Sequence, residues 1–381
     1  MARRCRLSRP VACAIMPANP YLTAKGRQPQ TSREETAVGY DVGSYRFDVT
    51  QFFTEDCFAA ISDVRVSEPE AVYEHAAARK RRQALTRDGR LVILAADHPG
   101  RSITRSEDAP LIMGNRQQYL GRVLRVVTAD DVDGIMGTPD ILEDLLIADM
   151  LVQRAGGDSF LDGKILMGSM NRGGLAGAAF ELDDKYTSFT AESISQLNMD
   201  AAKVMFRLDL TNPDSGNTIY YTSQAVNECA ELGIPIFIEP LPVEYKDGKY
   251  AVKRTAGELI KIAGVAAAVG GTSLGTWLKM PYCEGYDQVA RAVTLPILML
   301  GGESKGTPVP TLQEFAAGMR AGPNVRGALC GRNITFPGPD DPRAVAAAVA
   351  YVVHKDANAE NAVAYLQERR GEKMDDLSKW F

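Results

Sequence analysis

Eight short apolar runs, separated by longer segments with helical periodicity, constrain the fold of this chain more than any other feature. A regular alternation of strand and helix indicates βαβ units around a parallel sheet. Eight such units is the number in a (β/α)8 barrel, whereas a doubly wound sheet rarely needs so many equal units. We therefore predict a TIM barrel of the α/β class. The runs span residues 91–97, 133–137, 164–170, 201–210, 235–241, 276–282, 296–302 and 326–332.

The segments between the runs carry apolar residues at three- and four-residue spacing, as amphipathic helices do. We predict the barrel over residues 89–355 and a helical extension over 46–88 that caps the bottom of the barrel or leads into it. A C-terminal helix and tail are expected over 356–381. The least regular stretch, residues 171–193, follows the third strand and is long enough to be an active-site loop or lid.

The first 45 residues differ from the rest in composition. The opening MARRCRLSRP is rich in arginine and lacks acids, and the stretch that follows is polar and interrupted by Pro and Gly, so it cannot hold a core. Such a start also resembles an organelle transit peptide, but its amphipathic apolar face is weak. We expect a disordered tail.

Charge and cysteine content exclude several classes of partner. The formal net charge of -5 gives no basic field for nucleic acid or an anionic membrane. The six cysteines have no CxxC spacing, and the three histidines, His75, His98 and His354, have no metal-ligand spacing. We predict a cytoplasmic protein with reduced thiols, a small-molecule substrate, no metal and no cofactor.

The carboxyl ends of barrel strands converge on one pocket, which identifies candidate catalytic residues. Lys279 lies in the apolar run TWLKMPY, where desolvation is expensive for an ammonium group. Its aliphatic stem could cover apolar surface while its head reaches water. Alternatively, burial and the nearby Lys203 lower its pKa and supply a neutral amine for a Schiff base. We favour the second interpretation.

Two carboxylates and a histidine accompany these lysines. Glu239 interrupts PIFIEPLP and is either the ion-pair partner of a lysine or a general acid/base. Asp97 ends the first strand, where it is available to a substrate hydroxyl. His98 follows it and serves either to cap the turn or to contact substrate, and Arg207 lies further along the strand of Lys203.

The seventh and eighth strands end in glycine-rich sequences, LMLGGES and ALCGRNI. Glycines let backbone amides approach an anion closely, and barrels often bind phosphate after these two strands. We expect a phosphate site, with a bidentate contact from the arginine. The predicted residues are Gly301, Gly302, Ser304, Gly331 and Arg332.

The runs TWLKMPY, PILMLGGES and GALCGRNI together resemble the class I, Schiff-base aldolases of the deoxyribose-phosphate and fructose-bisphosphate aldolase superfamily. The resemblance covers roughly residues 90–340. It implies that Lys279 forms the carbinolamine and imine, with Asp97 and Lys203 as the matching first- and fourth-strand residues. The nearest branches are the tagatose-bisphosphate and sulfofructose-phosphate aldolases, which use a fifth-strand glutamate as here at Glu239.

Two departures argue for a separate branch. Leu241 stands where fructose-bisphosphate aldolases of this type carry a tyrosine acid, and DHPGR replaces an Asp-Gln-Arg pattern. The resemblance implies retro-aldol cleavage of a phosphorylated ketose, release of dihydroxyacetone phosphate or a similar three-carbon unit, and a homo-oligomer. The alternatives are an inositol-catabolic deoxy-keto-gluconate-phosphate aldolase, a deoxyribose-phosphate or transaldolase-like enzyme, and a non-catalytic sugar-phosphate-binding barrel.

Overall fold

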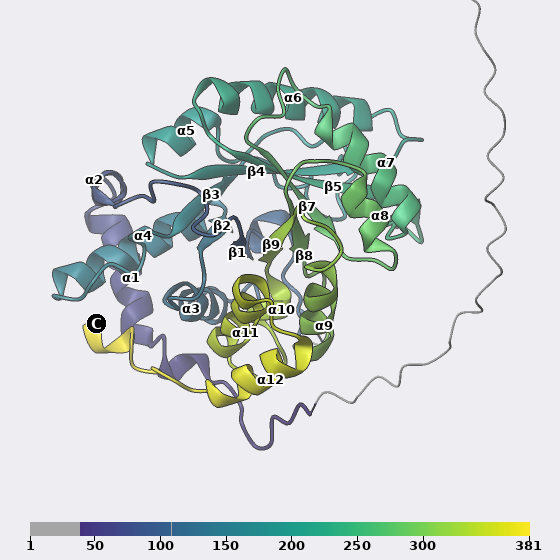
Figure 1. Ribbon diagram of the computed structural model, residues 1–381. Coiled ribbons are helices and arrows are strands. Elements are labelled where there is room, and N and C mark those ends of the chain that lie inside the picture. The colour runs from purple at the N-terminus through teal and green to yellow at the C-terminus, as the bar shows by residue number, and fades with distance from the viewer. Residues whose placement is uncertain (1–38, 108) are drawn as a thin grey trace, which may run out of the picture. The chain divides into compact units, whose positions relative to one another are not determined.

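Eight parallel strands close into a barrel, which confirms the predicted fold class (Figure 1). The computed structural model describes residues 39–107 and 109–381, so the predicted tail lies outside the described residues as far as residue 38. The strand order is β4-β3-β2-β1-β9-β8-β7-β5, and pairing of β4 with β5 closes the ring. The barrel strands are β1 (Leu91–Ala96), β2 (Gly134–Gly137), β3 (Ile165–Ser169), β4 (Ala201–Leu208), β5 (Ile236–Lys246), β7 (Thr276–Pro281), β8 (Ile297–Leu300) and β9 (Val325–Cys330).

Helices surround the strands, as their apolar periodicity predicts (Figure 1). The helices that follow the barrel strands are α3 (Arg116–Val127), α4 (Pro139–Arg154), α5 (Ala191–Gln196), α6 (Ser215–Glu231), α7 (Ala256–Ala267), α8 (Tyr286–Arg291), α9 (Val309–Gly318), α10 (Arg332–Thr335) and α11 (Pro342–Lys355).

Inward-facing residues form an apolar layer at the amino-terminal ends of the strands and a polar layer toward their carboxyl ends. The residues of β4 that face the surrounding helices belong to the main core, whereas Lys203 and Arg207 have the opposite parity. A separate apolar cluster fills the lower interior. Charged side chains therefore begin only above this plug, toward the carboxyl ends of the strands. The cluster comprises Leu91, Ile93, Ala95, Met136, Ile165, Met167, Ala201, Phe237, Leu298 and Leu329.

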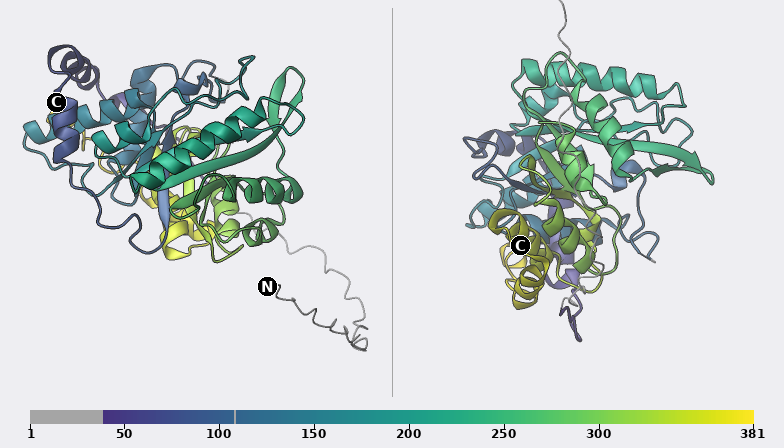
Figure 2. Two further views of the ribbon diagram at one scale, coloured as in Figure 1. Left: turned by 90° about the horizontal axis from the view of Figure 1, so that it is seen from above. Right: turned by 45° about the vertical axis from the view of Figure 1, so that its right-hand side comes forward.

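A β-hairpin that the sequence analysis missed extends β5 beyond the barrel. The strand β6 (Lys249–Val252) pairs antiparallel with the end of β5, and Figure 2 shows the hairpin projecting from the barrel. Asp247 and Gly248 form its turn with φ of 51° and 79°. An Asp-Gly pair is a favoured two-residue hairpin turn because both positions need positive φ.

The N-terminal extension contains two helices and a segment that crosses the bottom of the barrel. The helices α1 (Glu55–Ser67) and α2 (Ala71–Ala78) pack against α4. Beyond them, Arg79 pairs with Asp200 at 2.8 Å. Leu85 packs against the apolar interior cluster. This segment thus covers the amino-terminal ends of the strands.

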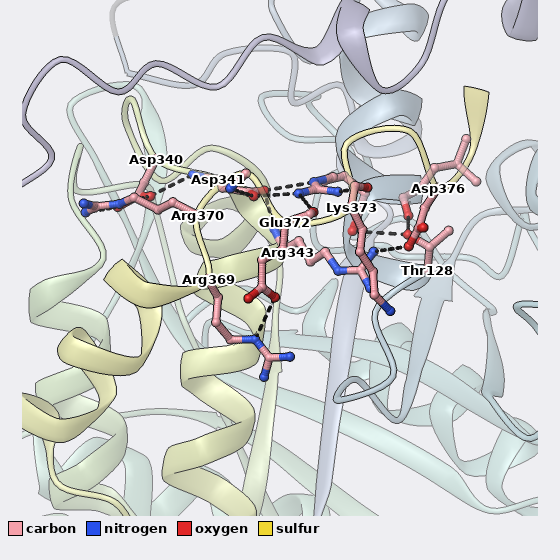
Figure 3. A network of polar contacts seen from close by, with 12 residues as sticks. Thr128, Asp340, Asp341, Arg343, Arg369, Arg370, Glu372, Lys373 and Asp376 are labelled. Carbon is pink, nitrogen blue, oxygen red and sulfur yellow. Dashed lines mark hydrogen bonds and ion pairs between the residues drawn. The ribbon is translucent and has the colours of Figure 1, made fainter. Parts of the chain in front are cut away.

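The C-terminal segment is anchored by buried ion pairs (Figure 3). Arg125 of α3 forms two hydrogen bonds with Asp341, which caps α11, and both side chains are fully buried. Arg370 follows the helix α12 (Ala359–Glu368) and pairs with Asp340 at 2.8 Å. The hydroxyl of Tyr40 donates to the same Asp340, so residues at both ends of the described chain meet here.

No helix among the described residues is long and apolar enough to cross a membrane.

Candidate active site

Two lysines and two carboxylates form one connected ionic cluster above the apolar plug. The Nζ atoms of Lys203 and Lys279 each lie 2.9 Å from the same oxygen, Glu239 Oε2. Lys203 Nζ also lies 3.2 Å from Asp97 Oδ2. The four side chains come from β4, β7, β5 and the residue after β1. Separate strands thus bring together the residues that the sequence analysis selected as catalytic.

The two carboxylates of this cluster stay ionised despite their burial. Desolvation alone would raise the pKa of Glu239, but the charges of Lys203 and Lys279 outweigh it and lower the pKa. Desolvation of Asp97 is likewise outweighed, chiefly by Lys203 and then by Arg101, so its pKa lies well below the usual range. Both groups are therefore ionised at neutral pH.

The surroundings of Lys279 disfavour its charged form. Burial lowers its pKa, the charge of Glu239 opposes that effect, and the like charge of Lys203 adds to it. Its side chain is 6% exposed, so the aliphatic stem does not carry the amine out to water. The interpretation in which the head of Lys279 reaches water is therefore wrong. The neutral form of its amine is populated at lower pH here than in water.

His98 is a neutral imidazole at the edge of the cluster. Burial lowers its pKa to about 3, against the attraction of Asp97, whose Oδ1 lies 3.9 Å from Nδ1. Nδ1 is buried and has no hydrogen-bond partner in the part of the chain that the structure describes. A Cβ on Gly331 would lie 2.4 Å from the ring, so this position must be glycine.

The glycine-rich ends of β8 and β9 lie beside two arginines. Gly302 has φ of 77°, and a Cβ there would lie 3.1 Å from Nη2 of Arg254. The side chain of Arg332 is 17% exposed, and its nearest carboxylate oxygen, on the exposed Glu303, is 3.7 Å away. These features leave backbone and guanidinium donors available to an anion.

Two other residues predicted for the phosphate site are engaged within the chain. The carbonyl of Gly301 accepts a hydrogen bond from Asn333. The hydroxyl of Ser304 lies 2.6 Å from the carbonyl of Phe336 and 2.9 Å from Glu107. The backbone of Gly301 and the hydroxyl of Ser304 therefore organise this loop internally.

The long loop after β3 is tied down over the barrel. Its Glu181 forms a buried ion pair with Arg207 of β4. The side chain of Asn171 donates to the carbonyl of Met205 at 2.7 Å and to Asp184 at 2.8 Å. Burial raises the pKa of Asp184 to about 6, against hydrogen bonds from Gly173 and Gly174 and the charge of Lys203. Arg207 thus serves first as an anchor for the loop.

Sequence reasoning missed Arg101 and Arg254. Arg101 ends the 3-10 turn η2 (Pro99–Arg101), and a Cβ on Gly173 would lie 3.5 Å from its Nε. Arg101 was within reach of prediction, because it follows Asp97 by four residues in DHPGR. No sequence pattern indicated a role for Arg254 in the site, because it precedes α7 in an ordinary polar segment.

Neither a metal site nor a cavity elsewhere in the described residues competes with this cluster as the candidate site. Among the described residues, no group of three or more His, Cys, Asp or Glu side chains is placed to hold a metal ion. A cavity of about 780 Å³ opens at the opposite end of the barrel, beside Trp277, Pro296 and Arg326. It contains none of the candidate catalytic groups, so the ionic cluster is the better candidate site.

Comparison with known proteins assigns a family. The Cgl0159-like family matches residues 89–353. The chain belongs to the Cgl0159-like family. The crystal structure of Cgl0159 from Corynebacterium glutamicum is 35% identical, with a TM-score of 0.74, and the match covers 80% of this chain and 99% of that one. No curated protein matches the chain.

More distant solved structures share the fold. A crystal structure of an archaeal fructose 1,6-bisphosphate aldolase is 18% identical, with a TM-score of 0.50, and the match covers 74% of this chain and 99% of that one. At this identity the likeness concerns the barrel alone. The shared feature is the TIM barrel, so any function must be argued from the side chains of this chain.

Proposed function

We propose that this chain is a class I aldolase that cleaves a phosphorylated ketose through a Schiff base on Lys279. One observation carries the proposal: Lys279 is buried, has a lowered pKa and touches a carboxylate that also holds a second lysine. A purely structural cluster does not need two ammonium groups on one oxygen. A nucleophilic amine does need a neighbour that disfavours its proton and a base that receives it.

In the first half of the reaction, the neutral amine of Lys279 attacks the ketose carbonyl and gives a carbinolamine. The carbinolamine oxygen leaves as water after protonation, and a protonated imine remains. Glu239, 2.9 Å from the amine, is placed to move protons to and from these atoms.

In the second half, Glu239 takes the proton of the C4 hydroxyl. The electrons of the C3–C4 bond move into the imine to form an enamine, and the C4 fragment departs as an aldehyde. The enamine then takes a proton at C3, and water hydrolyses the imine to release the three-carbon ketone and free Lys279. The lowered pKa keeps Glu239 ionised at neutral pH, so its carboxylate is free to accept this proton.

The remaining groups position the substrate. Asp97 accepts hydrogen bonds from substrate hydroxyls. The charge of Lys203 lowers the pKa of both Glu239 and Lys279, which favours the ionised carboxylate and the neutral amine. The phosphate of the three-carbon half binds at the backbone of Gly302 and Gly331 and at Arg332.

Trapping the imine tests this proposal. Borohydride reduction in the presence of dihydroxyacetone phosphate, followed by peptide mass mapping, is expected to place the adduct on Lys279. Absence of an adduct at saturating ligand would favour the non-catalytic sugar-phosphate-binding barrel instead. Lys279→Met is expected to abolish both the adduct and turnover.

Lys164 provides a matched control. It is also buried, and burial lowers its pKa to about 8, but its Nζ donates to the carbonyl of Val132 at 2.6 Å. It precedes β3, at the opposite end of the barrel from Lys279. Lys164→Met should lower stability and leave the adduct on Lys279. An adduct that instead disappears from Lys164→Met would contradict the assignment to Lys279.

A further inference from the structure

The cavity of about 780 Å³ at the amino-terminal ends of the barrel strands has no part in the proposed chemistry. We call it the floor cavity. Its walls come from the segments that precede β1, β8 and β9, from the end of α8 and from Trp277 of β7. Its volume lies in the range of small-molecule sites, which are concave and mostly apolar. The floor cavity is therefore a candidate for a second ligand.

Trp277 gives the floor cavity an aromatic surface. It has the inward-facing parity of β7, as Lys279 has two residues later, and it packs at the edge of the apolar interior cluster. Its indole stacks on Phe237, with ring centroids 5.3 Å apart and 25° between the planes. Trp277 nevertheless remains partly exposed where it lines the cavity. A planar ligand ring placed there would bury this apolar surface.

The side chain of Asn324 holds the cavity walls together. Its Nδ2 lies 2.9 Å from the carbonyls of Ala290 and Val293, and 3.2 Å from the carbonyl of Leu295. These contacts join the segment between α8 and β8 to the residue before β9. Each of the two segments also places a proline in the cavity wall, which restricts its backbone. The walls are therefore preorganised, which lowers the entropic cost of binding.

The charged residues that line the floor cavity are two arginines, and no acidic residue of the described chain lines it. Arg326 is partly buried and has no ion-pair partner in residues 39–107 and 109–381. Arg291 is exposed, and its nearest carboxylate, on Asp287, is 3.8 Å away. The nearby Asp88 accepts from Nδ1 of His354 at 2.8 Å when that nitrogen carries its proton. The charge of the cavity therefore favours an anion.

We propose that the floor cavity binds a planar aromatic ring that carries an oxyanion, a carboxylate or a phosphate, with the ring on Trp277 and the oxyanion on Arg326. A guanidinium suits either oxyanion, since it can offer two parallel N–H donors. This second site is independent of the aldolase proposal. Because Trp277 and Lys279 share β7, a ligand bound here would contact the strand that carries the candidate nucleophile.

The indole N–H signals of the full chain test the proposal by nuclear magnetic resonance, because Trp277 and Trp380 are its only tryptophans. The two signals are assigned with Trp380→Phe. Two matched pairs are then titrated, adenosine 5′-monophosphate with adenosine, and indole-3-acetate with indole-3-acetamide. At least one anion should shift the Trp277 signal and bind about 10-fold more tightly than its neutral counterpart, near the lower end for a hydrogen bond to a charged group. The anion with the larger ratio identifies the oxyanion.

Variants of two arginines locate the bound anion. Arg326→Gln should bring the affinities of the anion and its neutral counterpart close to a ratio of one, and Arg326→Lys should retain part of the preference. The control Arg332→Met, at the other end of the barrel, should keep the wild-type ratio. Circular dichroism and urea unfolding establish that each variant is folded.

Several outcomes would overturn the floor site. One is a Trp277 signal that neither anion shifts at millimolar concentration, and another is equal affinity of the wild type for each anion and its neutral counterpart. Loss of binding in Arg332→Met but not in Arg326→Gln would place the ligand at the candidate active site instead. A Trp277 signal that responds to protein concentration and not to ligand would mean that a second copy of the chain covers the cavity. None of these outcomes bears on imine trapping.

Discussion

Two buried ionic clusters in this molecule are built in opposite ways. Arg125 is fully buried and donates to both oxygens of Asp341, at 3.0 and 2.7 Å, and to the carbonyls of Lys373 and Glu372. In the barrel, by contrast, one oxygen of Glu239 receives two lysines at 2.9 Å. Among the described residues, the carboxylate oxygen nearest to the guanidinium of Arg101 is Asp97 Oδ2, at 3.9 Å.

The comparison distinguishes a cluster that stabilises the fold from one whose groups are arranged to bind a ligand. A buried ion pair tends to be stabilising only when its geometry is good and its remaining donors are satisfied. The cluster of Arg125 meets both conditions and joins α3, α11 and the C-terminal segment. Figure 3 labels three of its partners, Asp341, Glu372 and Lys373. In the barrel cluster the lysine contacts are short, but Nε of the neighbouring Arg101 has no hydrogen-bond partner among the described residues. The cluster also contains lysine, which can release its proton where arginine cannot.

The largest loss of stability is expected from Asp341→Asn. This change leaves the permanently charged Arg125 buried without its carboxylate, which should lower the free energy of unfolding by about 3–5 kcal/mol. Urea unfolding monitored by circular dichroism measures the loss. Under conditions where the variant remains folded, imine trapping should be retained. A loss of trapping there would mean that the two clusters are coupled.

Glu239→Gln should be less destabilising and more damaging to catalysis. Lys279 can become neutral when its partner is removed, so we expect a loss of about 1–3 kcal/mol, the cost of an unsatisfied buried group. Turnover should fall by about 100-fold or more, the range for a positioned acid/base group. Urea unfolding and steady-state kinetics provide the two values. A stability loss equal to that of Asp341→Asn would remove the distinction between the clusters.

Lys203→Met should produce the smallest effect, a shift in pH dependence. Imine formation requires neutral Lys279, so its rate rises with pH through the pKa of that amine. Since Lys203 lowers this pKa and shares Glu239 with Lys279, its removal should move the rising limb to higher pH. We would measure the rate of borohydride trapping at saturating dihydroxyacetone phosphate as a function of pH. The pH at which this rate rises gives the position of the limb. A shift to lower pH would contradict the proposed role of Lys203.

The sequence was sufficient to predict those features that depend on regular elements. Strand parity alone places Lys203 and Glu239 inside the barrel, because alternate residues of a strand face opposite sides. The Asp-Gly turn of the β5–β6 hairpin was also readable, although the prediction omitted it. Both signals are local in the chain.

The surroundings of Arg101 could not be read in this way. Its burial depends on a 3-10 turn after β1 and on the loop after β3, which lies more than 70 residues further along the chain. The shared oxygen of Glu239 likewise depends on the side-chain conformations of three strands. Contacts of this kind are set by packing between distant segments, and no periodicity encodes them.

The segment that crosses the bottom of the barrel has a consequence for the limits of the folding unit. The family match begins at residue 89, just after Arg79, Arg82 and Leu85. Arg82 pairs with Asp133 at 2.8 Å, and Leu85 packs into the lower interior. A fragment that begins at residue 89 would expose the floor of the barrel to water. The folding unit is therefore longer than the segment that matches the family.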